Sequence, residues 1–389
     1  MSSSPRLLGR RIHIAGSVPP PHPDFATAEQ VQYARNFVEA LVKALVRCGA
    51  TFVVPVDAEK RRQVDDLPIC FDWLVWMAIH DSHADRPSEA SGPLAIAVMH
   101  HKNEEQIPTE FASLWRDLRR SGLVQIESAA HWNMASKRME TQARRGEVLI
   151  ALGGGEGVQY LGNLYHDAGK PVIPLNLPVC PPNQGARRLF DFGATSQQSS
   201  RFFNTEDNNA HHWFHRINGS PTTSVAERVE DVVALLGVLQ RPRAFGVRLL
   251  NPSHNDFKQV EAHFNLVVKP IVEGELGYRL VVVDGRQPFE HSRMDQEIFA
   301  KLHRSGIVIA DITGLRPNCY IELGYALGRG LPTMLMAKEG TEHPFDIGTL
   351  SGHHWTPALD IEERKKAFRE HWSAIRSRPT LVPTEPLIP

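Results

Sequence analysis

Cysteine is scarce in this 389-residue sequence, which has only Cys48, Cys70, Cys180 and Cys319, all far apart. No C-x-x-C pair occurs, and no histidine lies near a cysteine at zinc-finger spacing, which argues against a disulfide framework and a structural zinc site. The sequence also lacks an apolar run near the roughly 20 residues of a membrane-spanning helix, and a signal-peptide core. We therefore expect a cytoplasmic protein with no membrane partner and no metal site.

The net charge is also close to zero, because 43 Lys and Arg residues balance 44 Asp and Glu residues. A protein that binds nucleic acid through a broad surface needs an excess of positive charge, so direct nucleic-acid binding is not expected. A local basic pocket for a small phosphorylated ligand stays open. The expected partner is therefore a small nucleotide. The length of the chain is too great for one ordinary hydrophobic core, which indicates two domains.

Buried apolar strands alternate with amphipathic helices along the chain. Residues 11–17 (RIHIAGS) and 51–56 (TFVVPV) are predicted strands on either side of a helix over about residues 27–48, which makes one βαβ unit. The same alternation returns later, with predicted strands at 244–250, 278–283, 307–312 and 332–337. The expected fold class is α/β: two tandem Rossmann-like domains, each with a mainly parallel sheet flanked by helices.

The alternation weakens between about residues 181 and 224, where polar and turn-prone residues dominate. The last 13 residues hold four prolines and little that can pack. We therefore predict a nucleotide-ligand-binding domain over 1–200, a linker with a connecting helix over 201–242, a catalytic domain over 243–376 and a disordered tail over 377–389.

The most specific motif lies in the C-terminal half. A strand ends at Asp311, a loop with Arg316 and Asn318 follows, and Glu322-Leu323-Gly324-Tyr325-Ala326 begins a predicted helix over residues 320–329. From about residue 244 to 355 this part of the chain resembles the nucleoside 2-deoxyribosyltransferase superfamily and the related TIR-like proteins. The resemblance implies cleavage or exchange of the N-glycosidic bond of a nucleoside, a nucleotide or NAD.

Cleavage of such a bond passes through an oxocarbenium-like state, which needs a carboxylate near C1′ of the ribose. Glu322, predicted in the first turn of a helix at the carboxyl edge of a parallel sheet, is well placed for this role. The resemblance puts the family's catalytic glutamate at Glu322 and further acids at Asp311 and Asp295. A purely structural role for Glu322, as a partner of the helix dipole, stays open.

The loop before Glu322 departs from the transferase pattern. Where those enzymes commonly have an acidic residue followed by glycine, this chain has Arg316-Pro317-Asn318, which fits the TIR-like and hydrolytic branch better. An arginine at this position favours a substrate that carries phosphate. The candidate substrate-binding residues are Arg248, Asn318, Arg316, Gly324 and Tyr325.

A glycine-rich turn marks the N-terminal half. The segment Gly153-Gly154-Gly155-Glu156-Gly157 separates a predicted strand over 147–152 from a predicted helix over 158–168. Such a turn exposes backbone N–H groups and the positive end of a helix to a phosphate. From about residue 11 to 176 the chain resembles the SLOG superfamily, whose lysine-decarboxylase-like hydrolases carry an acid on this helix that is missing here.

The missing acid favours ligand binding over hydrolysis in this domain, with a structural turn as the alternative. The candidate signal-binding residues are Gly16, Ser17, Gly153, Gly154, Gly155, Glu156 and Gly157.

Both resemblances together favour an effector of the bacterial antiviral type. Its N-terminal domain would sense a nucleotide-derived signal, and its C-terminal domain would cleave an N-glycosidic bond in NAD or a nucleotide. No cofactor is expected, and such proteins usually work as homo-oligomers. The alternatives are a housekeeping nucleoside deoxyribosyltransferase or nucleotide hydrolase with an N-terminal appendage, and a nucleotide sensor without catalysis.

Overall fold

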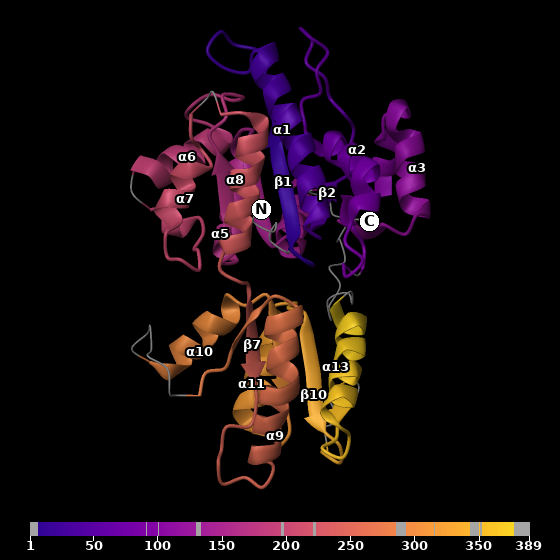
Figure 1. Ribbon diagram of the computed structural model, residues 1–389, viewed down its shortest axis with the longest axis vertical. Helices are drawn as coiled ribbons and strands as arrows, with labels where there is room; N and C mark the ends of the chain where they lie inside the picture. Colours follow the sequence, from indigo (N-terminus) through magenta and orange to yellow (C-terminus); the bar gives the residue numbers. More distant parts are fainter. Residues whose placement is uncertain are drawn as a thin grey trace. The chain divides into compact units, whose positions relative to one another are not determined.

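The computed structural model describes residues 7–376 with the exception of 91, 100, 130–133, 196–197, 221–222, 285–292, 315, 343–349 and 351. The expected disordered tail over 377–389 lies outside the described residues. The chain divides into two compact units, the first ending at Gln240 and the second beginning at Arg241. Each unit is a parallel sheet flanked by helices (Figure 1), which confirms the expected α/β fold class.

The first unit contains a six-stranded sheet in the order β4-β3-β2-β1-β5-β6. Every neighbouring pair in it is parallel. The strands are β1 (Arg11–Ser17), β2 (Thr51–Pro55), β3 (Ala95–Met99), β4 (Val124–Ser128), β5 (Val148–Gly153) and β6 (Val172–Leu175).

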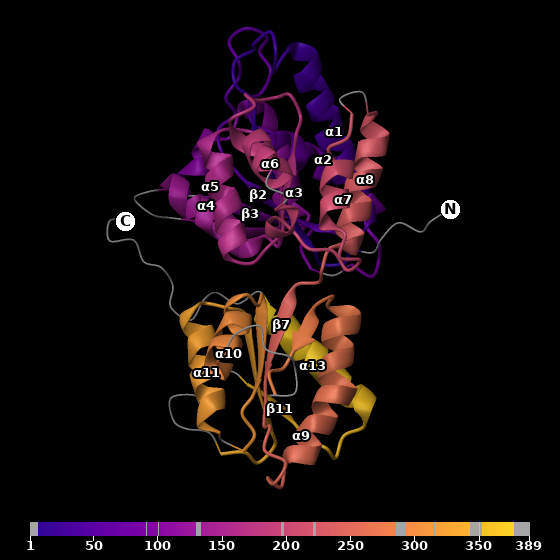
Figure 2. The same cartoon turned by 90° about the vertical axis from the view of Figure 1, so that its left-hand side faces the viewer.

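Helices cover both faces of this sheet, with α1, α2 and α8 on one face and α4 and α5 on the other (Figure 2). Their bounds are α1 (Ala28–Arg47), α2 (Asp72–Ser82), α3 (Ala112–Arg120), α4 (Met134–Arg145), α5 (Glu156–Asp167), α6 (Gly185–Thr195), α7 (Ala210–Arg216) and α8 (Val225–Val238). Short 3-10 helices span His83–Asp85, His101–Gln106, Thr109–Phe111 and Ser199–Arg201.

Helix α8 belongs to the first unit. It begins at a capping box in which Ser224 and Glu227 satisfy each other's backbone amides. It packs along α1 (Figure 1), where the Arg228 side chain donates to the hydroxyl of Tyr33 at 3.0 Å. The segment 201–242, expected as a linker, also contributes buried Phe202, Trp213 and Phe214 to the core of this unit.

The second unit contains a five-stranded parallel sheet in the order β11-β10-β9-β7-β8. Its strands are β7 (Arg243–Val247), β8 (Arg279–Val281), β9 (Ile307–Asp311), β10 (Thr333–Lys338) and β11 (His353–Trp355). Its helices are α9 (Phe257–His263), which continues as π-helical turns over Phe264–Val268 and Pro270–Glu275, and α10 (Met294–His303), α11 (Pro317–Gly328) and α13 (Ile361–Arg376).

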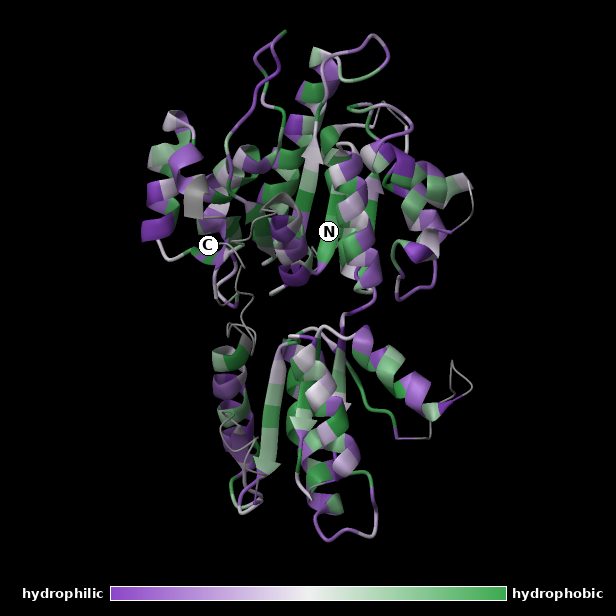
Figure 3. Ribbon diagram, turned by 180° about the vertical axis from the view of Figure 1, so that it is seen from behind, coloured by the Kyte–Doolittle hydropathy of each residue, from purple (hydrophilic) through white to green (hydrophobic). Residues whose placement is uncertain are grey.

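Two hydrophobic clusters fill the faces of this second sheet. Helices α9 and α13 cover one face and α10 and α11 the other (Figure 2). In both units the strands are coloured as hydrophobic while the outward sides of the helices are hydrophilic (Figure 3), as expected for parallel strands buried on both faces.

Each sheet grows outward in two directions from a central pair of strands. In the first unit the pair is β1 and β5, and in the second it is β7 and β9. At such a switch point the chain leaves neighbouring strands toward opposite faces, which opens a crevice at their carboxyl ends.

None of the helices among the described residues is long and apolar enough to cross a membrane.

The β1–β5 pair leaves no room for side chains at its carboxyl end. A Cβ atom added to Gly16 would lie 1.8 Å from the carbonyl oxygen of Leu152 on β5. A Cβ on Gly185, the first residue of α6, would lie 2.1 Å from the carbonyl oxygen of Gly154, and Gly185 has a φ of +52°. Glycine at these positions lets two strands and a helix start meet with backbone against backbone.

We expect Gly16→Ala to destabilise the first unit by about 3 kcal/mol or more, because the obstructing atom belongs to the backbone and cannot rotate away. Gly155→Ala is the matched control, since nothing lies within 4 Å of a Cβ there, and it should cost about 1 kcal/mol or less. Urea denaturation followed by circular dichroism measures both. Equal stability of the two variants would contradict the tight packing of β1 against β5.

Candidate functional site

Glu322 lies at the carboxyl edge of the second sheet. Helix α11 follows β9 and begins at Pro317, with Arg316 as its N-cap residue. Proline suits the first helical position because its fixed φ and missing N–H cost nothing there. The helix therefore starts three residues earlier than the sequence pattern predicts, and Glu322 lies in the second turn rather than the first. A partnership with the helix N-terminus is weaker at that distance.

Burial raises the pKa of Glu322 to about 7, and the positive charge of Arg316 opposes this rise. The carboxyl group is thus half-buried, with a guanidinium as its charged neighbour. A half-buried carboxyl group with a pKa near neutral pH and a charged neighbour is a candidate catalytic acid or base.

Four of the predicted residues converge around Cys319. Burial raises the pKa of the Cys319 thiol to about 12, and the nearby charges of Glu322 and Asp311 add to the rise while Arg316 lowers it. The thiol itself faces the backbone carbonyl of Arg248 at 3.8 Å. The fold therefore gathers these side chains at one edge, although they come from three separate segments of the chain.

Asp311 is fully buried at the end of β9, and its carboxylate has protein partners. It accepts a hydrogen bond from Nε1 of Trp355 at 2.8 Å and from the backbone amide of Thr313 at 2.9 Å. Burial raises its pKa to about 6, and the bonds to Thr313 and Trp355 and the charge of Arg248 counteract the rise. This geometry suits a residue that holds the edge of the sheet together.

Arg248 follows β7 and is the cation that faces Asp311. Its side chain is 11% exposed, its guanidinium lies 5.7 Å from the ring of Phe264, and it approaches Glu261 at 3.8 Å. Its Nη1 is buried without a hydrogen-bond partner among the described residues. A buried guanidinium nitrogen with unused donors is suited to an anionic ligand.

The remaining predicted residues lie outside this group. Asn318 and Gly324 are exposed on α11, with open space around Gly324. The hydroxyl of Tyr325 contacts Nδ1 of His303 at 2.7 Å on α10. Asp295 is 54% exposed and forms an ion pair with Arg293, whose hydrogen bonds lower its pKa.

The sequence motif did not point to His254, which also lies at this edge in the loop after β7. Its ring lies beside Gly314, where a Cβ would come within 3.2 Å of Nε2. Its Nδ1 accepts the backbone amide of Asp256 at 3.2 Å, and Asp256 in turn pairs with Lys338 at 2.6 Å. It lies in the loop between β7 and α9 and belongs to no motif, so the sequence alone does not single it out.

At the carboxyl edge of the first sheet, the glycine turn divides into a packed and an open part. Gly153 and Gly154 are buried with φ of +62° and +73°, and the amide of Gly154 donates to the carbonyl of Ser17 at 2.6 Å. Gly155 caps α5 without a side-chain hydrogen bond. Because first-turn amides lack acceptors within their helix, those of Glu156 and Gly157 are the ones suited to an anion.

Carboxyl groups from other segments of the first unit lie near this turn. Ser17 forms a β-bridge with Cys70, so the loop before α2 lies against the end of β1. Burial raises the pKa of Asp72 to about 7, and the charges of Glu59 and Asp57 contribute while Arg138 opposes them.

Glu59 belongs to the same group. Burial raises the pKa of Glu59 to about 7, whereas a hydrogen bond from the backbone of Cys70 and the positive charge of Arg35 lower it. Glu59 Oε1 and Arg35 Nη1 are buried without hydrogen-bond partners among the described residues. The first unit therefore has two carboxyl groups of raised pKa near the glycine turn, Glu59 in the segment after β2 and Asp72 at the start of α2.

No group of three or more His, Cys, Asp or Glu in the described part of the chain is arranged to hold a metal ion. Both edges carry carboxyl and guanidinium groups, and the edge of the second unit also carries the imidazole of His254.

Comparison with protein families gives a match over the first unit. The family described as "ATP nucleosidase Cap17-like, N-terminal" matches residues 7–236, more than half of the 389 residues. The matched part extends from before β1 into the last turn of α8, and the second unit lies outside it. No curated protein matches the chain.

A buried histidine behind Asp311 makes the second unit sensitive to acid. His263 is fully buried, stacks on Trp355 with ring centroids 4.2 Å apart, and has no hydrogen-bond partner among the described residues for either nitrogen. Burial, then the charges of His353 and Arg364, lower its pKa from 6.5 to about 3. Below pH 6.5 the unfolded chain therefore binds a proton that the folded chain excludes, so stability falls as the pH falls.

Removing this histidine should remove that part of the acid sensitivity. His263→Phe keeps the stacking on Trp355, so between pH 7.5 and pH 5 wild type should lose about 2 kcal/mol more than the variant. Urea midpoints of both proteins at the two pH values measure the difference. The same pH dependence in both proteins would show that His263 is not neutral in the fold.

Proposed function

The chain belongs to the Cap17-like ATP nucleosidase family, and we propose that it hydrolyses the N-glycosidic bond of a nucleotide in its second unit. A nucleosidase cleaves the bond between C1′ of a sugar and a base nitrogen, so the family supports a glycosidase-type enzyme. ATP is the first substrate to test, because the family's description names it, and NAD is the second. The first unit serves as the sensor of a nucleotide signal, as in effectors of the antiviral type.

The observation that carries the proposal is the environment of Glu322. Its carboxyl group, with a pKa of about 7, lies beside Arg316 on a helix that starts at the carboxyl edge of the sheet, next to the β7–β9 switch point. Substrates of open α/β sheets bind at that edge. A carboxylate in a partly desolvated site stabilises a developing oxocarbenium ion far better than one in water.

The reaction balances with water as the only co-reactant. The electrons of the C1′–N bond leave with the base, Glu322 stabilises the positive charge on the ribose, and water adds to C1′ while its proton passes to the base. His254, with an imidazole at the same edge, is suited to move that proton. Arg316 and Arg248 supply positive charge for the substrate phosphates.

Ligand binding in the first unit uses the open part of the glycine turn. The first-turn amides of α5 and the positive end of that helix favour a phosphate. Binding there changes the rate in the second unit only if the signal binds the active state more tightly than the inactive state.

A second candidate is cleavage in the first unit, and the carboxyl groups of Asp72 and Glu59 favour it. Both have a pKa of about 7. Glu59 lies in the segment between β2 and α2, which bridges to Ser17 through Cys70 beside the glycine turn, and Asp72 is the first residue of α2. Two such groups near a phosphate-binding turn are the minimum for acid and base catalysis of glycoside hydrolysis.

We expect Glu322→Gln to fold normally and to lower the rate of base release by a factor of about 100 to 1,000, because it removes the charge that stabilises the oxocarbenium ion. Glu370→Gln on α13, an exposed position, is the matched control and should keep full activity. Chromatography of free adenine and nicotinamide from ATP and NAD measures both. Near-normal release by the Glu322→Gln variant would contradict catalysis in the second unit.

The pH profile tests the same carboxylate independently. Since Glu322 acts in its ionised form and has a pKa of about 7, kcat/KM of the wild type should increase about tenfold per pH unit below pH 7 and level off above it. A rate already constant from pH 5 upward would mean that another group limits the reaction.

Gly155→Val should abolish stimulation by the signal without changing the basal rate. Its side chain would occupy the open space in front of the first-turn amides, where a phosphate would bind. A Cβ atom at this position has no other atom within 4 Å. Base release with and without a library of nucleotide signals measures the effect. Stimulation that persists in this variant would place the signal elsewhere.

Asp72→Asn separates the two candidate sites. If the second unit cleaves, the variant keeps its unstimulated rate and Glu322→Gln does not. If the first unit cleaves, the results are reversed, with a loss of at least about 100-fold in Asp72→Asn. Both substitutions keep the side-chain shape, and thermal unfolding checks that both variants are folded.

A further inference from the structure

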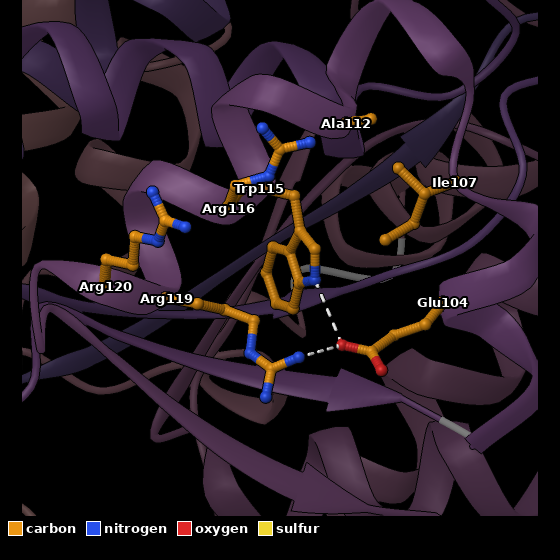
Figure 4. Close-up of a pocket in the computed structure, with 7 residues that line it drawn as sticks. All are labelled: Glu104, Ile107, Ala112, Trp115, Arg116, Arg119 and Arg120. Carbon is orange, nitrogen blue, oxygen red and sulfur yellow. Dashed lines mark hydrogen bonds and ion pairs between the residues drawn. The ribbon is translucent and has the colours of Figure 1, made fainter.

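A cavity lies along helix α3, away from both edges described above. It has a volume of about 560 Å³, within the range of about 300 to 1,000 Å³ of small-molecule sites. Helix α3 connects β3 to β4 at one end of the first sheet, whereas the glycine turn follows β5 on the other side of β1. The lining residues are Glu104, Ile107, Ala112, Trp115, Arg116, Arg119 and Arg120 (Figure 4).

Positive charge dominates the cavity. Glu104 is the one carboxylate among its lining residues, and it forms an ion pair with Arg119 and accepts the indole N–H of Trp115 at 3.3 Å (Figure 4). Arg116 and Arg120 are exposed, and neither has an ion pair or side-chain hydrogen bond among the described residues. Two guanidinium groups thus stay free for an external anion.

The spacing of these two arginines is unfavourable without such an anion. Residues four apart lie on the same side of a helix, where like charges repel. Arg119 and Arg120 in the last turn gain from the helix dipole, but Arg116 lies too far from the helix end for that effect. An anion between Arg116 and Arg120 would offset the repulsion.

The wall behind the arginines is rigid and apolar. Trp115 is 5% exposed and packs edge-on against Trp76 of α2, with ring centroids 5.5 Å apart. Phe111, just before α3, stacks on Trp73 at 4.7 Å. Tight aromatic packing fixes the backbone of α3, so the two guanidinium groups extend from a fixed base and lose less entropy when they bind a ligand.

We propose that this cavity binds the polyphosphate group of a small ligand, through Arg116 and Arg120. The ligand class is a nucleoside di- or triphosphate or a free inorganic polyphosphate, because both present adjacent phosphates that paired guanidinium groups bind with charge-assisted hydrogen bonds. Ile107 and Ala112 give the cavity an apolar side against which a base or sugar packs. The site is distinct from the glycine turn and from the edge of the second sheet, and it does not depend on the cleavage proposed there.

Hydrogen–deuterium exchange on the full-length protein tests the site locally. Millimolar ATP and inorganic tripolyphosphate should each slow exchange in peptides from residues 104–120, whereas adenosine should not. In the double variant Arg116→Gln/Arg120→Gln the ligand concentration for half-protection should rise at least about tenfold. Stronger protection by ATP than by tripolyphosphate identifies a nucleotide as the ligand. Equal protection by the two compounds shows that the site recognises the phosphates alone.

The control variant Arg201→Gln/Lys366→Gln removes two exposed positive charges elsewhere and should keep the wild-type protection. Since all four positions are exposed, both double variants should melt within a few degrees of wild type. The proposal is wrong if neither phosphate compound protects residues 104–120, if adenosine protects them as well as ATP does, or if both double variants weaken protection equally. Protection by an acidic peptide alone would instead identify a protein-binding surface.

Discussion

Both units depend on one constraint, which is that two parallel strands can be joined only by a crossover. A sheet that grows in two directions therefore grows outward from a central pair of strands. In the first unit that pair is β1 and β5, and in the second it is β7 and β9. The crossovers leave each pair toward opposite faces, which opens a crevice at the carboxyl ends of the pair. Residues that are distant in sequence meet there because of the topology, whatever their local preferences.

The two edges use that space differently. In the second unit Asp311 gives its hydrogen-bonding capacity to Trp355 and Thr313. Burial of Glu322 is opposed, among the described residues, by the charge of Arg316. Asp311 is therefore held by protein partners, whereas the carboxyl group of Glu322 keeps a raised pKa beside a single guanidinium group. In the first unit Asp72, Glu59 and Asp57 lie close enough for their charges to interact, and close carboxyl groups cannot all be ionised at neutral pH without cost.

The sequence predicted the architecture better than it predicted the sites. Strands such as TFVVP and IVIAD are buried on both faces and read as apolar runs, so α/β units were evident. Strand β11 has only three residues, two of them histidines, and no such run. The segment 201–242 looked like a linker because polar residues surround its buried aromatic ones. Glu322 was found through a motif, but Asp72 and His254 were not, because only tertiary structure brings them to an edge.

The bond between Asp311 and Trp355 also has a consequence for how the chain is made. The two residues are 44 positions apart, and the buried carboxylate has no indole partner until synthesis has passed β11. A chain released early, after α11 and β10 are complete, would have a buried acid that lacks one of its hydrogen-bond donors, which costs about 1 to 3 kcal/mol. Truncated chains would therefore be least stable at the carboxyl edge of the second sheet, and that edge is where proteolysis of an incomplete chain would begin.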